Sequence, residues 1–397
     1  MLLKRDLQQK INRVVEREEF VIITGARQTG KTSLLMMLKE NMDNQQKTTH
    51  YFNLENPDYL KLLNKHPYNI FELIPGRKGK QYIFIDEVQY LDNPSNFLKL
   101  LFDEKRHMLK IIASGSSAFY IDRKFKDSLA GRKFLFELFP LNFDEYLKFK
   151  DQGELLERKN KKLSVYYKNK LLSLWEEYLI YGGYPKVVLA GSQDIRKAIL
   201  EEIGSSYIKK DASEAGVKNT DKYFSMLKIL AGQVGQLVNS QELSNTLNLA
   251  HKTVEEYLGV MKKSYQIALI KPFYKNLRKE LTKMPKVFFY DLGLRNFFLG
   301  DFSSLAQRKD KGVYWENVAF REFLRETGGV DQIKFWRTQD KNEVDFVVKN
   351  NAFEVKSDAK KNRKGKYNQF KKQYPEIKLN FLNPSMILDR FYNYKSG

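Results

Sequence analysis

A short apolar run, Phe20 to Thr24, leads into the loop Gly25-Ala26-Arg27-Gln28-Thr29-Gly30-Lys31-Thr32 and then into a leucine-rich helical pattern. The order is strand, loop and helix, and the loop has the complete G-x-x-x-x-G-K-T spacing of a phosphate-binding loop. Gly25 and Gly30 allow backbone conformations that let successive N–H groups converge on a phosphate, beside the positive end of the helix dipole. This stretch predicts a nucleotide site; the alternative is a plain glycine turn before an amphipathic helix.

Within this loop the residue types predict separate roles. The Lys31 ammonium can bridge the β- and γ-phosphates of ATP, and the Thr32 hydroxyl can bind Mg²⁺. The remaining residues of the loop and the first helical turn are predicted to surround the phosphates: Gly25, Ala26, Arg27, Gln28, Thr29, Gly30 and Ser33.

A second apolar strand, Gln81 to Ile85, ends in the carboxylates of Asp86 and Glu87. In open α/β sheets, ligands bind at the carboxyl ends of the parallel strands. Asp86 can hold Mg²⁺ through water, and Glu87 can polarise the attacking water. Two acids at a strand end can also be a surface cap, but a complete phosphate loop upstream favours the functional interpretation.

The next strand, Lys110 to Ala113, runs into Ser114-Gly115-Ser116-Ser117. Ser114 and Ser116 are candidate sensors, because hydroxyl groups at that edge can contact the γ-phosphate or orient the water. The same residues can equally form an ordinary turn between strand and helix. With further strands near residues 50–54 and 134–138, the alternation of strand and helix predicts a parallel α/β domain with helices on both faces over residues 1–150.

The amino-acid composition indicates the cellular compartment of the protein. The 397 residues contain no cysteine, which excludes disulfides and zinc–thiolate sites and suits a reducing cytosol. The charged N-terminal segment lacks a signal-peptide core, and no apolar run reaches the roughly 20 residues that span a bilayer. We therefore expect a cytoplasmic protein. Its net charge of +21 favours a polyanionic partner, nucleic acid first, unless it reflects only a lysine-rich composition.

The middle of the chain is predicted to be helical. Residues 151–215 give a charged helical pattern that indicates a lid or linker. Residues 216–295 give three helical segments and two short apolar strands, the order of a winged helix-turn-helix. Its third helix would bind nucleic acid, DNA favoured, through Lys252, Lys262 and Lys263, although Glu255 and Glu256 on the same helix leave a purely structural role open.

The C-terminal part, residues 300–397, predicts a hairpin with chemistry on one face. A two-residue turn at Asn350 and Asn351 would pair Asp345 with Lys356 and bring Glu354 alongside them, opposite an apolar face. Two carboxylates beside an ammonium suit the binding of Mg²⁺ or Mn²⁺ and the activation of water against a phosphodiester. The alternative is a polar hairpin face with a surface salt bridge.

These motifs resemble a family, the AAA-plus type ATPases of archaea and bacteria that carry a C-terminal domain of unknown function. The resemblance rests on the phosphate loop, Asp86-Glu87-Val88-Gln89, Ala113 to Ser117 and Gly131-Arg132. Three later stretches also match: Tyr181-Gly182-Gly183-Tyr184-Pro185, Tyr290-Asp291-Leu292-Gly293-Leu294 and Glu343-Val344-Asp345-Phe346. The resemblance implies a homo-oligomer in which Arg132 reaches the γ-phosphate of a neighbouring subunit; the alternative is a surface arginine.

The C-terminal hairpin, with a glutamate from the preceding helix, resembles the restriction-endonuclease-like superfamily. That resemblance implies metal ligands at Glu316, Asp345 and Glu354, with Lys356 as a catalytic cation. The four segments therefore predict a P-loop ATPase domain, a helical lid, a winged helix and a nuclease-like α/β domain. We expect an ATPase that acts on DNA, with a nucleotide-dependent switch that recruits a protein partner as the alternative. A membrane-associated ATPase would need a basic amphipathic helix, and the sequence offers none that is convincing.

Overall fold

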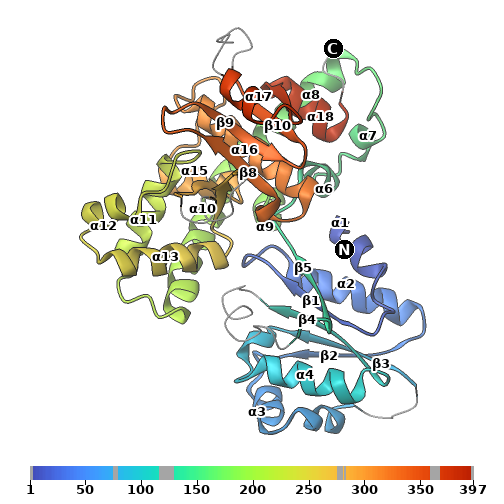
Figure 1. The fold of residues 1–397 in the computed structure, drawn as a ribbon. Helices are drawn as coiled ribbons and strands as arrows, with labels where there is room; N and C mark the ends of the chain where they lie inside the picture. The colour runs from blue at the N-terminus through green and yellow to red at the C-terminus, as the bar shows by residue number, and fades with distance from the viewer. Residues whose placement is uncertain are drawn as a thin grey trace. The chain divides into compact units, whose positions relative to one another are not determined.

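The computed structural model describes residues 3–74, 79–115, 129–274, 280, 283–357 and 367–394 (Figure 1). The chain divides into two compact units. The first comprises Met1–Pro140 with Lys263–Tyr265, and the second comprises Leu141–Lys262 with Gln266–Gly397. The predicted sensor Ser116 lies outside the described residues, as do the lysines between residues 358 and 366.

The first unit is built on a parallel sheet whose five strands take the order β2-β3-β4-β1-β5. Each pair of neighbouring strands runs parallel, so all the carboxyl ends share one edge of the sheet. The strands are those expected from the sequence: β1 (Phe20–Thr24), β2 (Thr48–Asn53), β3 (Gln81–Asp86), β4 (Leu109–Gly115) and β5 (Lys133–Glu137).

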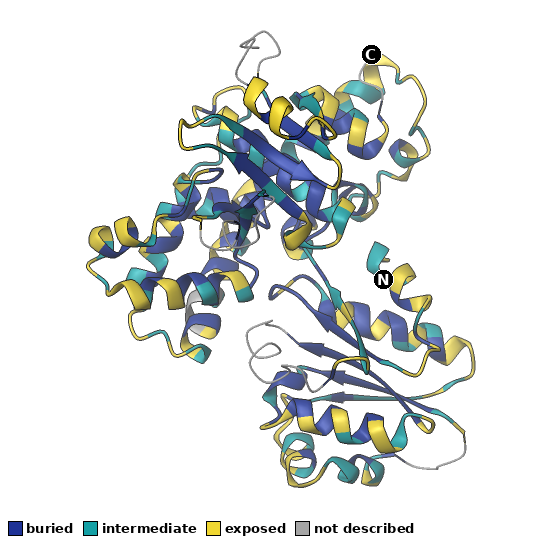
Figure 2. Cartoon of the chain, viewed as in Figure 1, coloured by how far each residue is buried: buried dark blue, intermediate teal, exposed yellow. Residues whose placement is uncertain are grey.

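Helices cover both faces of this sheet, as predicted. Phe20 and Ile22 of β1 pack into one core with α3 and α4, whereas Val21 and Ile23 pack into a second core with α1 and α2. In Figure 2 the inner strands β1, β3 and β4 are accordingly buried and the edge strands β2 and β5 are mostly intermediate, while the outer faces of the helices are exposed. The helical elements are α1 (Asp6–Asn12), α2 (Lys31–Asn44), α3 (Pro57–Lys65), η1 (Pro67–Glu72), η2 (Val88–Tyr90) and α4 (Pro94–Lys105).

The second unit contains a mixed sheet with the strand order β11-β10-β9-β8-β6-β7. The β6–β7, β8–β9 and β9–β10 pairs are antiparallel, and the β6–β8 and β10–β11 pairs are parallel. The strands are β6 (Ile267–Pro272), β7 (Lys286–Phe289), β8 (Ile333–Arg337), β9 (Glu343–Val348), β10 (Asn351–Val355) and β11 (Lys378–Leu382).

The helices of the second unit surround that sheet and extend away from it (Figure 1). The three helices predicted over residues 223–263 are present as α11, α12 and α13. The helices are α6 (Phe143–Phe149), α7 (Gly153–Leu156), α8 (Val165–Tyr181), α9 (Pro185–Val188), α10 (Gln193–Ser206), α11 (Thr220–Gly232), α12 (Ser240–Leu247), α13 (His251–Lys263), α15 (Leu292–Leu299), α16 (Lys311–Thr327), α17 (Asn368–Gln373) and α18 (Pro384–Tyr392).

The domain boundary that the sequence predicted within this unit does not separate its strands. The strands β6 and β7, expected to form a separate wing, belong to the same sheet as the C-terminal hairpin β9–β10. The reason is the parallel pairing of Lys271 with Lys334 and of Pro272 with Phe335, a long-range contact that no local pattern encodes. Residues 216–295 and 300–397 therefore share one sheet.

Two of the glycine-containing motifs meet in the interior of the second unit. The Asp291 carboxylate accepts hydrogen bonds from the backbone N–H of Gly183 (2.8 Å) and of Leu294 (2.9 Å). A Cβ atom on Gly293 would lie 2.0 Å from the carbonyl oxygen of Tyr181, so only glycine fits this backbone approach. These motifs therefore hold helices together.

Among the described residues, no helix is both long enough and apolar enough to cross a membrane.

Candidate nucleotide site and C-terminal acidic cluster

The phosphate loop follows β1 and ends where α2 begins, at Lys31. Its backbone is left-handed at Gln28 (φ 61°) and again at Gly30 (φ 91°). A left-handed glutamine is a sparsely populated conformation that costs on the order of 1 kcal/mol and persists where surrounding contacts fix it. The loop is thus held in a strained, preformed shape at the N-terminus of α2, where anions bind.

Gly25 is required by a close approach between the loop and the residue after β5. A Cβ atom there would lie 2.2 Å from the carbonyl oxygen of Leu138. The Leu138 N–H donates to the Thr24 carbonyl oxygen at 2.7 Å, which fixes this approach. Any side chain at Gly25 would therefore push the phosphate loop away from β5.

The predicted phosphate ligands lie at the start of α2. The Lys31 ammonium donates hydrogen bonds to the carbonyl oxygens of Gly25 (3.0 Å) and Ala26 (2.8 Å), so it curls over the loop. Thr32 and Ser33 are exposed in the first turn, and the Thr29 hydroxyl donates to Ala26 at 2.8 Å inside the loop. Of the other predicted loop residues, Arg27 is buried and Gln28 is exposed.

Asp86, the last residue of β3, and Glu87 after it lie at the same edge of the sheet as the loop, because β3, β4 and β1 are neighbouring parallel strands. Asp86 is buried and accepts hydrogen bonds from the hydroxyl groups of Ser114 on β4 and Tyr51 on β2, the latter at 3.1 Å. Tyr51 was not predicted from the sequence, since its pairing depends on the neighbouring position of β2. Burial and the Asp86 carboxylate raise the pKa of Tyr51, so the phenol keeps its proton and donates.

Glu87 is half-buried and has a left-handed backbone (φ 56°), an uncommon conformation for a residue with a side chain. The Gln89 amide donates to the Glu87 carboxylate, and the Glu87 backbone N–H donates to the Ser114 hydroxyl oxygen at 3.4 Å. Gln89, which the sequence marked only as part of a motif, thus orients Glu87. Mg²⁺-dependent phosphate chemistry needs a hard oxygen ligand and a water-polarising group, and the buried Asp86 and the oriented Glu87 are of the residue type that could supply them.

Arg132 lies at the opposite edge of the sheet, directly before β5. Its Nε atom is 2.6 Å from Oδ1 of Asp103, and its Nη2 atom is 3.2 Å from Oδ2. The hydrogen bond from Arg132 holds the pKa of the Asp103 carboxyl below its ordinary value. Since β1 and β5 run parallel from this edge towards the phosphate loop, Arg132 lies at the far end of the sheet from the loop of its own chain.

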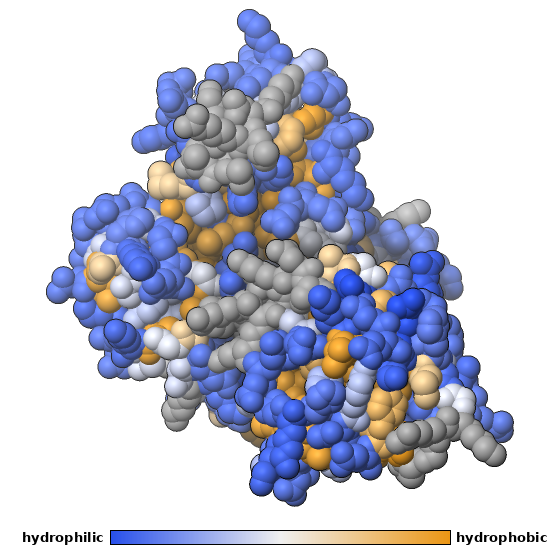
Figure 3. All heavy atoms as spheres, turned by 60° about the horizontal axis from the view of Figure 1, so that its bottom comes forward, coloured by the Kyte–Doolittle hydropathy of each residue, from blue (hydrophilic) through white to orange (hydrophobic). Residues whose placement is uncertain are grey.

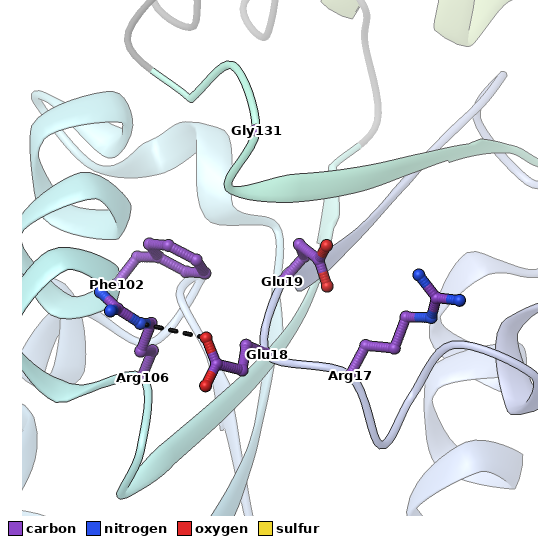
Figure 4. Close-up of a pocket in the computed structure, with 6 residues that line it drawn as sticks. All are labelled: Arg17, Glu18, Glu19, Phe102, Arg106 and Gly131. Carbon is purple, nitrogen blue, oxygen red and sulfur yellow. Dashed lines mark hydrogen bonds and ion pairs between the residues drawn. The ribbon is translucent and has the colours of Figure 1, made fainter.

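An open pocket of about 490 Å³ lies at this same edge. Figure 4 shows its lining from three segments: the residues before β1, the end of α4, and Gly131 before β5. Arg106 and Glu18 form an ion pair across it, with Nε 3.2 Å from Oε2. The pocket lies away from the phosphate loop, and both positive and negative side chains line it. It is therefore not part of the nucleotide site.

The C-terminal hairpin forms with a register different from the predicted one. Phe353 pairs with Phe346 and Asn351 pairs with Val348, so the predicted pairing is wrong by two residues. The turn is formed by Lys349 and Asn350 instead of Asn350 and Asn351, and Lys349 takes a left-handed backbone (φ 53°). A shift of two residues leaves every side chain on its predicted face.

The polar face of this hairpin is not exposed. Asp345 and Glu354 are 6% and 1% exposed, because α17 covers that face with Tyr367 and Phe370 packed against Val347 and Ala352. Burial and the nearby Glu354 carboxylate raise the pKa of Asp345 to about 6. The alternative, a polar hairpin face with a surface salt bridge, holds only in part, because Lys356 does pair with Glu354 but both carboxylates are buried.

The four predicted residues of this domain do come together. Glu316 on α16 is close enough to Asp345 that burial and this carboxylate raise the pKa of Glu316 well above its ordinary value. The Asp345 carboxylate accepts a hydrogen bond from the Val355 N–H at 2.8 Å, and the Lys356 ammonium donates to Glu354. We call these four residues, together with Lys286 and Glu343, the acidic cluster.

Sequence reasoning missed a buried lysine in this cluster. Lys286 on β7 is fully buried, donates to Glu343 and lies 3.8 Å from Oε2 of Glu316. Burial opposes its charge, but the carboxylates of Glu316, Asp345 and Glu343 outweigh burial and raise the pKa of Lys286.

Within the described residues, no three acidic or histidine side chains converge closely enough to hold a metal ion as arranged.

The three lysines predicted to bind nucleic acid lie on or at the end of α13. Lys252 and Lys262 are exposed and Lys263 is half-buried, whereas Val254, Leu258 and Met261 face the interior. Glu255 accepts a hydrogen bond from the Ser240 hydroxyl of α12, so this acid is engaged within the unit. The exposed lysines of α13 are thus accessible to a partner.

Residues 17–147 match a protein family described as "AAA domain". The first unit, with its parallel sheet, phosphate loop and acids on a neighbouring strand, is therefore a P-loop ATPase domain of the AAA type. Residues 172–305 and 311–391 match two families that are each described as a domain of unknown function, DUF8612 and DUF4143.

Three similar proteins are described only as uncharacterized. One from Haemophilus influenzae is 28% identical over 370 residues, which cover 88% of this chain and 84% of the relative. One from Methanocaldococcus jannaschii is 27% identical over 351 residues, which cover 85% and 75% of the two chains. One from Mycobacterium tuberculosis is 25% identical over 352 residues, which cover 88% and 71%.

Two solved structures resemble the chain loosely. The Thermotoga maritima RuvB Holliday junction branch migration motor is 14% identical, with 71% of this chain and 95% of that chain covered and a TM-score of 0.34. The replication initiator DnaA bound to AMPPCP and single-stranded DNA is 14% identical, with 66% and 90% covered and a TM-score of 0.33. At these TM-scores neither likeness carries a functional argument.

Proposed function

We propose that this protein binds and hydrolyses ATP with Mg²⁺ and acts on or with DNA. The observation that carries the proposal is the buried Asp86, held by Ser114 and Tyr51 at the sheet edge that also bears the phosphate loop. A phosphate loop beside a buried, hydrogen-bonded carboxylate is the arrangement that P-loop phosphoryl transfer uses.

In this proposal each residue has one task. The loop N–H groups and Lys31 would bind the β- and γ-phosphates, and Thr32 and Asp86 would hold a Mg²⁺ ion. Glu87, oriented by Gln89, polarises the attacking water. Ser114 lies between the two acids and would respond to the γ-phosphate. Bound Mg²⁺ would neutralise the charge that develops on the transferred phosphoryl group.

DNA as the partner is supported by charge and accessibility. The chain carries a net charge of +21, and a polyanion is attracted to such an excess. On the face drawn in Figure 3, hydrophilic residues cover most of the surface, with hydrophobic residues visible in smaller areas between them. Lys252, Lys262 and Lys263, which belong to α13, are the proposed contacts, within helices that follow the winged-helix order.

The proposal includes a homo-oligomer, in which Arg132 would act on a neighbouring subunit. It lies at the far edge of the sheet from its own phosphate loop, so any contact with a γ-phosphate would come from a neighbouring subunit. The ion pair with Asp103 would hold the side chain until that contact forms.

DNA cleavage that depends on Mg²⁺ or Mn²⁺ is a second candidate function. It is favoured by the gathering of Glu316, Asp345, Glu354 and Lys356 from a helix and a hairpin into one cluster. Among the described residues the carboxylates as arranged do not form a metal site, and the Lys286 ammonium already pairs with Glu316 and with the neighbouring Glu343. If the cluster is inactive, the same domain serves a nucleotide-dependent switch that recruits a protein partner.

The deciding experiment is the ATP turnover rate of the parent protein, measured alone and with single-stranded, duplex and branched DNA and with RNA. Stimulation by one of the DNA forms supports the proposal. Turnover without stimulation by any nucleic acid would favour the protein-recruiting switch, and absence of ATP binding in calorimetry would overturn both. The Lys31→Ala variant controls for a contaminating ATPase.

A further inference from the structure

Arg5, which the sequence did not single out, lies directly before α1 and is 5% exposed. Its Nη1 atom donates a hydrogen bond of 2.7 Å to the carbonyl oxygen of Thr29. Its Nη2 atom donates a hydrogen bond of 2.7 Å to the carbonyl oxygen of Phe139. One buried guanidinium thus joins the phosphate loop to the segment that follows β5.

The first of these hydrogen bonds falls where the loop is most strained. Thr29 stands between Gln28 and Gly30, the two left-handed residues of the loop. For the N–H groups of a phosphate loop to face an anion, neighbouring carbonyl groups must face the protein and find donors there. Arg5 supplies such a donor for Thr29, with the strength of a charge-assisted bond.

The second hydrogen bond fixes the other side of the loop. Leu138, one residue before Phe139, is the residue whose carbonyl oxygen lies against Gly25. The fork of Arg5 therefore spans both ends of the loop, from Gly25 near Leu138 to Thr29 before Gly30. A planar guanidinium with several fixed donors can do this, whereas a lysine ammonium offers a single point of charge.

The helix that follows Arg5 anchors it. Ile11 of α1 is fully buried and packs in the same core as Leu34 and Leu38 of α2. The guanidinium is therefore held between a packed helix and the loop.

We infer that Arg5 is a positioning residue for the nucleotide site: it holds the phosphate loop in the shape that binds the phosphates of ATP. The inference rests on the proposed ATP binding. Because the guanidinium bonds to the loop backbone, its removal weakens ground-state and transition-state binding alike. The expected signature is a raised Kd and KM for ATP with little change in kcat.

The test compares Arg5→Met with Arg13→Met, an exposed arginine at the end of the same helix. Calorimetry with Mg²⁺ and ATP should give a Kd raised about tenfold for Arg5→Met, the effect of losing about 1.4 kcal/mol of loop restraint. The Kd of Arg13→Met should match the parent, and kcat of Arg5→Met at saturating ATP should stay within about threefold.

Two further variants keep the inference testable if Arg5→Met is poorly folded. Arg5→Lys should bind ATP with an intermediate Kd, and Arg5→Ala should regain affinity when guanidinium ion is added at a few millimolar. Equal Kd values for the parent, Arg5→Met and Arg5→Lys would overturn the inference, as would failure of guanidinium to restore Arg5→Ala. If the parent itself binds no ATP, the proposed function fails instead.

Discussion

The guanidinium of Arg132 lies 2.6 Å from the carboxylate of Asp103, at the edge of the sheet that faces away from the phosphate loop of the same chain. The position of this ion pair determines what Arg132 can contact. A residue at that edge cannot reach its own nucleotide, so its contribution to hydrolysis would depend on a second copy of the chain.

Arg132→Ala should lower kcat about 1,000-fold, the low end of what an arginine finger supplies. Mixing Arg132→Ala with Lys31→Ala should restore part of the activity, because some interfaces then pair an intact loop with an intact arginine. The measurement is steady-state ATP turnover of each variant and of the mixture. No recovery on mixing, or a strictly monomeric protein with ATP in light scattering, would remove Arg132 from the mechanism.

Glu87→Gln should keep ATP binding and lower kcat by a factor of about 100 to 1,000, because the amide preserves shape but cannot polarise water. Lys31→Ala should instead weaken ATP binding about 100-fold, since the phosphates then lack a charge-assisted hydrogen bond from the loop. Calorimetry and single-turnover hydrolysis separate the two effects. If Glu87→Gln hydrolysed ATP at the parent's rate, the assignment of the water-polarising group would be wrong.

Reversing Lys252, Lys262 and Lys263 to glutamate should weaken binding to duplex DNA. The dependence of log K on log salt should become shallower by about one for each phosphate that the variant no longer neutralises. The matched control reverses three lysines exposed on the first unit, Lys61, Lys65 and Lys99, which changes the net charge equally. Equal weakening in both triple variants would mean that net charge alone attracts DNA and that α13 is not the platform.

Asp345→Asn should abolish any DNA cutting in Mn²⁺ or Mg²⁺ while leaving ATP turnover intact. The same substitution should be tolerated at neutral pH, because the buried Asp345 has its pKa raised to about 6 and is costly to ionise. The measurements are a plasmid-cleavage assay and the thermal midpoint of unfolding at pH 7.5. A control, Lys349→Gln, changes an exposed residue at the hairpin turn. Cutting that survives in Asp345→Asn would place the activity elsewhere.

Lys110 predicts a pH dependence of stability in the first unit. Burial, with the Lys80 charge adding to it, lowers its pKa to about 8, and its ammonium donates to the carbonyl oxygens of Arg17, at 2.8 Å, and Glu19. Between pH 8 and the unfolded value near 10.5, the unfolded state binds more protons than the folded one. The free energy of unfolding should therefore rise with pH there, by at most about 1.4 kcal/mol per pH unit.

The comparison for this prediction is Lys110→Met, which lacks the titrating group. Urea unfolding of both proteins at pH 7.5, 8.5 and 9.5 should show the parent gaining stability relative to the variant as the pH increases. Parallel curves for parent and variant would show that Lys110 keeps an ordinary pKa in the folded state.

The sequence by itself determined the parts of the molecule that local patterns encode. The strand Phe20–Thr24, the phosphate loop and the helix after it follow from apolar runs, glycine spacing and helical periodicity. Asp86 and Glu87 could be placed at the ligand edge because the carboxyl ends of parallel strands share that edge. The faces of the C-terminal hairpin followed from the two-residue period of a strand.

The tertiary structure alone decided which distant residues complete these sites. Tyr51 reaches Asp86 only because β2 lies beside β3, and Lys286 enters the acidic cluster only because β7 and β6 join the sheet of the C-terminal hairpin. Arg5 reaches Thr29 across 24 positions of sequence. Such contacts depend on the order of the strands, on the register of their pairing and on the helices that cover a sheet face. A register shift of two residues leaves the same side chains on each face, so the apolar pattern of the sequence does not reveal it. None of these leaves a periodic trace in the chain, because each is fixed by the packing of segments that are far apart in sequence.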